Sequence, residues 1–168
     1  KISERSLAWM QELPEFLRFQ HGNHRCLVVH GSYFDTSQYI FRSTPWEEKA
    51  RNFEAAEADV IIAGHCGLPF HEVREGRYWL NPGVIGMPAN DGTTRVWYME
   101  LQPSAGALGF RHRVLEFDYE ETFARMLETE LPIAYAKTLT SGLWDNNDIL
   151  PEAETAAQGV ALDLEIPL

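Results

Sequence analysis

The sequence has little cysteine and no long apolar run. Two cysteines in 168 residues, Cys26 and Cys66, cannot form the disulfide framework of a small secreted protein, so we expect a reducing compartment, the cytoplasm. No apolar run approaches the roughly 20 residues that span a bilayer, and no signal peptide is visible. We therefore expect no membrane partner.

Basic charge is also scarce. The chain carries 14 Lys and Arg against 25 Asp and Glu, a formal net charge of −11. Because phosphate-backbone contacts need clustered Lys and Arg, we expect no general nucleic-acid surface. A small anionic substrate remains compatible with this charge, since a bound divalent ion can outweigh the local field of the protein.

What is present is globular. Hydrophobic residues make up 45% of the chain, enough for one domain with a core of its own. The sequence opens with KISERSLAWMQEL, which lacks an initiator Met and enters a helical pattern at once. We interpret this start as a cut inside a longer protein.

The first half of the chain predicts a βαβ-like unit. Thr44 is expected to cap a helix, with Pro45 in its first position and Glu47 completing a capping box. The run DVIIAG, residues 59–64, has no polar alternation and predicts a strand buried on both faces. The other expected elements are a short helix from Ser3 to Pro14, a hairpin of strands 16–20 and 25–30 that turns at HGNH, and the end of the capped helix near Ala58.

The second half predicts further antiparallel pairing and then helices. PFHEV and RYWLN flank the turn Glu75-Gly76, and RVWYMELQ and LGFRHRVLEF flank the loop PSAGA, so each pair reads as two neighbouring strands. Helices are expected over residues 118–129 and 133–140. The acidic tail is expected to be irregular, held to the domain by Leu143, Trp144, Ile149 and Leu150.

Two histidines stand in matching positions. CLVVHGS places His30 at the carboxyl end of one buried strand, followed by Gly31, and VIIAGHCG places Gly64 and His65 at the end of the next. If the strands are parallel, both imidazoles project from the sheet edge at which open α/β sheets bind ligands. Either each histidine simply ends a strand and bonds a nearby carbonyl, or the two hold a divalent transition metal. The repeated arrangement favours the metal.

The next predicted strand leads into NPGVIG, residues 81–86, which is expected to line the same edge. Asn81 has two interpretations, a ligand contact or a residue that shapes the turn before Pro82. From the sequence alone, the turn is favoured. The glycines beside the histidines, Gly31 and Gly64, allow a close approach of the backbone to a metal or phosphate.

The segments VVHGS, DVIIAGHCGLPF and WLNPGVIGMPAND, in this order, resemble the second half of a calcineurin-like metallophosphoesterase of the bacterial phosphodiesterase type. The resemblance covers about residues 1–118. That family shows a late His-Gly motif, a Gly-His-x-His motif and an Asn-Pro-Gly-Ser segment. Position by position, His30 matches the single motif histidine and His65 the first histidine of Gly-His-x-His, which in the family bind the same metal.

The sequence departs from the family pattern in two ways. Gly67 stands where the family has the second histidine of Gly-His-x-His, and Val84 stands where Ser is common. The Asp-x-His, Gly-Asp and Gly-Asn-His-Asp motifs, which carry the bridging Asp, the remaining ligands and the catalytic acid, are absent and are expected upstream. Asn23 and His24 imitate one of them, but they lie in a predicted turn only six residues before His30.

The resemblance implies a fold of two packed mixed β-sheets flanked by helices, an αββα sandwich present here as its C-terminal part. Residues 1–129 would belong to that domain and residues 130–168 would form a helical and irregular acidic extension packed on it. The implied reaction is hydrolysis of a phosphate mono- or diester of a small molecule by a metal-activated water, with Mn, Fe, Zn or Ni in a dinuclear centre. No catalytic residue is assigned in this chain, its expected partner is the missing N-terminal half of the same fold, and we predict that alone it is inactive and binds metal weakly.

Two alternatives remain open. Loss of the ligand at Gly67 is also typical of a non-catalytic scaffold with a degraded metal site. A mononuclear zinc site of His30, His65 and Cys66 is the other, although a small packed cysteine is the favoured interpretation of Cys66. Further candidates, expected to be surface, loop, core or anchor residues rather than site residues, are His21, His71, His112, Asp35, Trp46, Trp97 and Trp144.

Overall fold

The computed structural model describes residues 2–102, 106, 108–129 and 132–164. Most of the predicted loop at residues 103–107 lies outside this description. The elements, in chain order, are α1 (Glu4–Gln11), β1 (Leu17–His21), β2 (His24–Val29), α2 (Trp46–Ala56), β3 (Val60–Ala63), β4 (Phe70–Arg74), β5 (Arg77–Asn81), β6 (Val96–Gln102), β7 (Gly109–Leu115), α3 (Tyr119–Leu127), α4 (Ile133–Ser141) and α5 (Glu152–Ala156).

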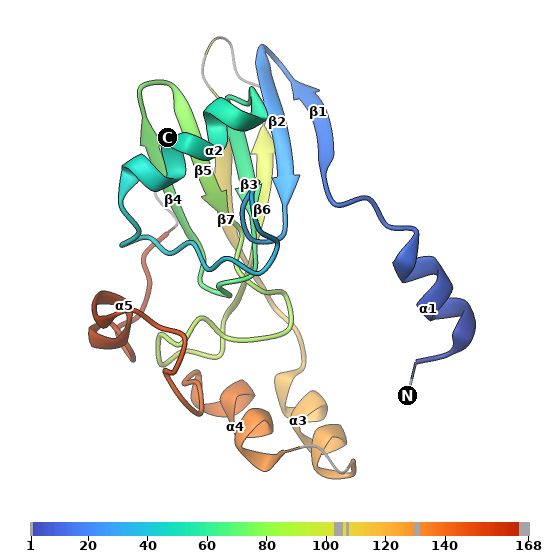
Figure 1. The fold of residues 1–168 in the computed structure, drawn as a ribbon. Coiled ribbons are helices and arrows are strands. Elements are labelled where there is room, and N and C mark those ends of the chain that lie inside the picture. The colour runs from blue at the N-terminus through green and yellow to red at the C-terminus, as the bar shows by residue number, and fades with distance from the viewer. Residues whose placement is uncertain (1, 103–105, 107, 130–131, 165–168) are drawn as a thin grey trace.

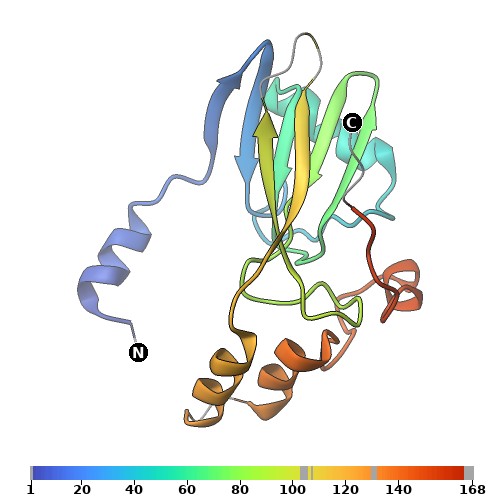
Figure 2. The ribbon, with the colours of Figure 1, turned by 180° about the vertical axis from the view of Figure 1, so that it is seen from behind.

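Five strands form one mixed sheet in the order β1-β2-β3-β5-β4. The three central strands, β2, β3 and β5, run parallel, while β1 and β4 join the edges as antiparallel hairpin partners. β6 and β7 form a separate antiparallel pair behind this sheet (Figures 1 and 2). The prediction of two packed mixed sheets is therefore confirmed for the first sheet and wrong for the second in the described part of the chain.

The central strand β3 explains why its sequence lacks alternation. Ile61 packs on one face with Phe53 of α2, and Val60 packs on the other face with Phe110 of β7. Both faces of the strand are covered, so Val60 and Ile61 have no exposed surface. This arrangement keeps the carboxyl ends of β2, β3 and β5 on one edge of a rigid sheet.

The remaining helices lie away from the sheets. α3 and α4 lie side by side beyond the carboxyl edge of the parallel strands (Figures 1 and 2). α1 lies beyond the edge strand β1, away from the sheet (Figure 1). Ser3 caps α1 as expected, accepting a hydrogen bond from the Ser6 backbone N–H at 3.1 Å. Among the described residues, every helix is too short or too polar to reach across a bilayer.

Two local predictions are wrong. Thr44 does not cap α2, because its Oγ1 accepts a hydrogen bond from the Phe41 backbone N–H at 2.9 Å and closes the preceding turn instead. The helix ends at Ala56, close to the expected end near Ala58, and Glu57 after it adopts the left-handed conformation. The tail, expected to be irregular, contains the short helix α5, and Glu154 in it accepts hydrogen bonds from the Ser43 N–H and hydroxyl at 3.0 and 2.6 Å.

Candidate metal centre

His30 and His65 meet at the carboxyl edge of the sheet. His30 follows β2 and His65 follows β3, and the Gly64 N–H donates to the His30 carbonyl at 2.9 Å just beyond the parallel ladder. His30 Nε2 and His65 Nδ1 lie 3.0 Å apart, so one ring nitrogen donates to the other. His30 is exposed and His65 half-buried, which leaves the pair open to solvent.

This pair fits neighbouring ligands of a first-row divalent ion. An ion about 2.1 Å from each of two imidazole nitrogens spans a pair separated in this way. Among the described residues, however, no three His, Cys, Asp or Glu side chains come close enough together to hold a metal ion. The described residues thus bring two histidines together but no complete ligand set.

Tyr39 stacks on the His65 ring and was not anticipated from the sequence. The two ring centroids lie 4.2 Å apart with an angle of 23° between the planes. His65 itself has a positive φ of 61°, a conformation that non-glycine residues seldom adopt and that neighbouring contacts must hold. Tyr39 lies in a loop nine residues after His30, and no local pattern marks it as a partner of His65.

Asn81 holds the loop that carries His65. Its buried side-chain amide donates to the Gly64 carbonyl and to Cys66 Sγ, both at 3.1 Å. Its Oδ1 accepts from the Gly83 N–H at 2.9 Å, which is the turn-shaping contact favoured from the sequence. Contact of Asn81 with a ligand stays a prediction.

His112, on β7, contacts the backbone of Asn81. Its Nε2 lies 3.0 Å from the Asn81 carbonyl oxygen, and the ring is only 1% exposed, so the expectation of a surface position for His112 is wrong. Burial lowers the pKa of His112 below its usual value, which favours the neutral ring. The reason for the error is that β7 turns this side chain toward the first sheet, a fact that strand periodicity does not reveal.

Of the two predicted site glycines, Gly31 occupies a crowded position and Gly64 does not. A Cβ on Gly31 would lie 2.7 Å from the carbonyl oxygens of Gln38 and Thr36, so the loop after His30 folds directly over this residue. A Cβ on Gly64 would meet the His30 carbonyl at 3.5 Å. The proximity of Gly31 and Gly64 to a substrate stays a prediction.

Cys66 does not join the histidines. It is fully buried, and burial raises the pKa of its thiol to about 11. Its Sγ lies 3.7 Å from the Leu68 carbonyl and accepts from Asn81. Because no three-ligand group occurs in the described residues, the structure does not form the alternative zinc site of His30, His65 and Cys66.

Gly67 is packed against the tail. Its φ is +75°, and a Cβ built on it would lie 3.2 Å from the Cη2 and Cζ2 atoms of Trp144. The Trp144 indole N–H donates to the Pro88 carbonyl and its backbone N–H to Asn90 Oδ1, both at 2.8 Å. Trp144 is therefore the tail anchor that the sequence predicts, and it closes the space beside Gly67.

A cavity of about 190 Å³ lies next to His65. The His65–Gly67 loop forms one wall, and the tail forms another with Trp144, Asp145 and Asn146. Residues far apart in the sequence thus face each other across an open space that borders His65.

The remaining candidates behave as structural residues. Asn23 lies in the β1–β2 turn, and His24 begins β2 and packs edge-on against Tyr78 with ring centroids 5.5 Å apart. Asp35 Oδ1 accepts from the Ser37 N–H at 2.7 Å on the surface. Trp97 is 2% exposed, as a core residue should be.

The comparisons with known proteins agree with this fold. A family profile for the calcineurin-like phosphoesterase superfamily domain matches residues 2–104, more than half of the chain. No curated protein sequence matches it.

Two solved structures are similar over most of the chain. A metallophosphoesterase from Sphaerobacter thermophilus is 26% identical with a TM-score of 0.67, over 84% of this chain and 63% of that one. A hypothetical protein from Pyrococcus horikoshii has the same fold, with 18% identity and a TM-score of 0.69 over 83% of this chain and 55% of that one. This chain thus spans between about half and two-thirds of the length of these relatives. By the family match and the shared fold, the chain belongs to the calcineurin-like phosphoesterase superfamily.

Proposed function

We propose that this chain forms part of a metal-dependent phosphoesterase that hydrolyses phosphate mono- or diesters of small molecules. The observation that carries the proposal is the contact of His30 Nε2 with His65 Nδ1 at 3.0 Å, at the end of two parallel strands. Membership of the calcineurin-like phosphoesterase superfamily supports the same chemistry.

Each residue of the site has a proposed role. His30 and His65 hold one divalent ion, of the Mn, Fe, Zn or Ni kind that imidazole accepts, and the complete protein would hold two. When bound, such ions activate water as the nucleophile and neutralise charge on the phosphoryl oxygens. Tyr39 and Asn81 act as positioning residues, because one stacks on the His65 ring and the other ties down its loop.

The rest of the catalytic machinery is proposed to come from sequence preceding residue 1. The catalytic acid and the bridging carboxylate have no counterpart among the motifs of this chain. We also propose that residues 1–129 form a domain and residues 130–168 an extension of it. The proposed location is the cytoplasm, with no membrane or nucleic-acid partner. Gly31, Gly64 and Asn81 would then border the substrate.

The test compares this chain with the natural gene product that includes any preceding sequence. We expect the longer protein to hydrolyse bis(p-nitrophenyl) phosphate with Mn²⁺, and the substitution His65→Asn to abolish that turnover without unfolding the protein. His21→Asn, which changes a histidine away from the site, is the matched control and should leave turnover intact. Robust manganese-dependent hydrolysis by residues 1–168 alone, or full activity of His65→Asn, would overturn the proposal.

One observation favours a second function, a non-catalytic scaffold. The edge of Trp144 lies against Gly67, so a histidine side chain at the position of the lost ligand would fit only if Trp144 shifted. A scaffold predicts that the longer protein lacks intact Asp-x-His and Gly-Asn-His-Asp motifs and shows no turnover with any of the four metals. An intact upstream ligand set would remove this second candidate.

A further inference from the structure

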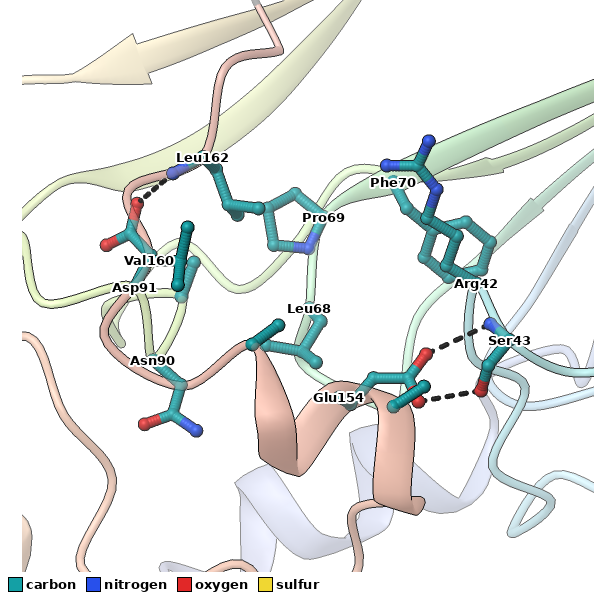
Figure 3. Close-up of a pocket in the computed structure, with 13 residues that line it drawn as sticks. Arg42, Ser43, Leu68, Pro69, Phe70, Asn90, Asp91, Glu154, Val160 and Leu162 are labelled. Carbon is teal, nitrogen blue, oxygen red and sulfur yellow. Dashed lines mark hydrogen bonds between the residues drawn. The ribbon is translucent and has the colours of Figure 1, made fainter.

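A cavity of about 280 Å³ lies between the body of the domain and the tail, and the proposed phosphoesterase does not use it (Figure 3). Leu68, Pro69 and Phe70 form its floor on the body side. Two apolar residues of the tail, Val160 and Leu162, line the opposite side. A cavity of about 150 Å³ already holds benzene when its walls are apolar, so this one has room for a ring and a short chain.

The polar groups on the wall are already engaged within the protein. Each oxygen of the Glu154 carboxyl group accepts a hydrogen bond from Ser43, as the dashed lines in Figure 3 show. The buried Asp91 carboxyl group accepts from Arg95 Nη2 and from the Leu162 N–H, both at 3.0 Å. The Asp91 carboxyl group, which also accepts two hydrogen bonds from Thr93, is therefore fully engaged, whereas the Glu154 carboxyl group is held by Ser43 and keeps one further acceptor site on each oxygen.

Asn90 is engaged in the same way. Its Oδ1 accepts from the Trp144 N–H at 2.8 Å and from Gln158 Nε2 at 3.1 Å, and its amide nitrogen donates to Asn147 Oδ1 at 3.3 Å. This side chain joins the loop after β5 to the tail, which leaves it one amide N–H and no acceptor to offer a ligand.

Arg42 is different. Its side chain is exposed at the rim of the cavity beside Phe70 (Figure 3), and within the described residues it makes no ion pair and no side-chain hydrogen bond. A guanidinium group in this position offers a fork of N–H donors that matches a carboxylate. The cavity thus combines an apolar interior with one uncommitted cation at its mouth.

From this combination we propose that the cavity is a binding site for a small organic acid. The apolar body of the ligand would lie between Leu68 and Leu162, and its carboxylate would pair with Arg42 at the rim. An apolar pocket with a few placed polar groups is the usual design of small-molecule sites. Because Leu68 and Pro69 continue the loop that carries His65, such a ligand would contact the back of that loop.

The test uses three probes that differ in one group: 3-phenylpropionate, 3-phenylpropan-1-ol and 3-phenylpropylamine. Binding is followed by two-dimensional NMR on the backbone N–H signals of Leu68, Phe70 and Leu162. We expect saturable shifts with a Kd on the order of 1 mM for the acid. The alcohol should bind roughly fivefold more weakly, because it loses the contact with an exposed charge, and the amine more weakly still.

Four substitutions separate the parts of the proposal. Arg42→Gln should bring the acid to the affinity of the alcohol, whereas Arg42→Lys should keep part of the preference. Ala157→Phe should fill the cavity and remove all binding, and Ala156→Phe, the adjacent residue outside the cavity wall, should leave it unchanged.

The contrary results are equally defined. The proposal is overturned if no probe gives saturable shifts at about ten times the expected Kd, if the acid and the amine bind alike, or if Ala157→Phe binds the acid as the unaltered chain does. Because the readout is binding alone, a failure here leaves the phosphoesterase proposal untouched, and loss of phosphoesterase activity leaves this site untouched.

Discussion

Replacing Gly67 by alanine should destabilise the chain more than the same change at Gly76, a turn glycine of similar backbone conformation. Two separate costs arise. Gly67 has a φ of +75°, and an L-residue in the left-handed region costs about 1–2 kcal/mol. The new Cβ would also lie 3.2 Å from the edge of Trp144, and forcing extra atoms into a packed site typically costs about 1–3 kcal/mol.

Gly76 provides the matched control. Its φ is +74°, almost the same as that of Gly67, but nothing lies within 4 Å of a Cβ built on it. Gly76→Ala should therefore show the conformational cost alone, about 1–2 kcal/mol. Because the contact at Gly67 involves a single methyl group, its additional cost should lie near the lower limit of the overpacking range, about 1 kcal/mol.

Urea unfolding of the two variants, in the presence and absence of Trp144→Ala, isolates the contact. The free energy of unfolding is read from the midpoint, and the m-value must stay constant for the comparison to hold. In the Trp144→Ala background the difference between Gly67→Ala and Gly76→Ala should vanish, because the aromatic edge is gone. Equal effects of the two glycine substitutions in the unaltered chain, or a difference that survives Trp144→Ala, would refute the packing argument. If the two glycine substitutions had equal effects, Gly67→His would also be expected to fit.

Three further predictions follow from the contacts of the site and the sheet. Asn81→Ala should lower the free energy of unfolding by about 2 kcal/mol because it leaves buried partners unpaired. Asn23→Ala, in the exposed turn, should have almost no effect in the same urea titration. Equal effects of the two substitutions would contradict the role of the Asn81 amide. Cys66, whose thiol pKa of about 11 reflects burial, should resist a thiol-specific reagent at pH 8 and react only after urea unfolding; fast reaction in the native state would disprove the burial. The side-chain hydrogen bond from Arg25 lowers the pKa of Asp59 from 3.8 to about 2. The contribution of this pair to the free energy of unfolding should therefore be complete above about pH 4 and fall toward pH 2, and Asp59→Asn should flatten that fall. An unchanged acid profile in Asp59→Asn would contradict the linkage.

The part of the site that could be predicted from sequence is the part that follows from single strands. The apolar run before Gly64 indicates a strand covered on both faces, and the helix between two such strands favours parallel pairing. Parallel pairing places the ends of both strands on one edge. His30 and His65 therefore meet, as their matching positions suggest.

The remainder depends on contacts between distant residues. Tyr39 reaches His65 across a loop, His112 reaches Asn81 from the second sheet, and Trp144 reaches Gly67 from the tail. No periodicity or turn signal in the sequence records such contacts. The short helix α5 was missed for the same reason, because five residues form a helix only marginally by themselves and here Glu154 docks it on the body.

The most direct test of the proposed metal centre is a titration of the chain with Mn²⁺, followed by the NMR signals of its six histidine rings. We expect the paramagnetic ion to broaden the His30 and His65 signals together and before all others, and His65→Asn to abolish the effect at His30. Broadening that begins at other histidines, or an effect at His30 that persists in His65→Asn, would contradict the assignment of these two residues to one metal.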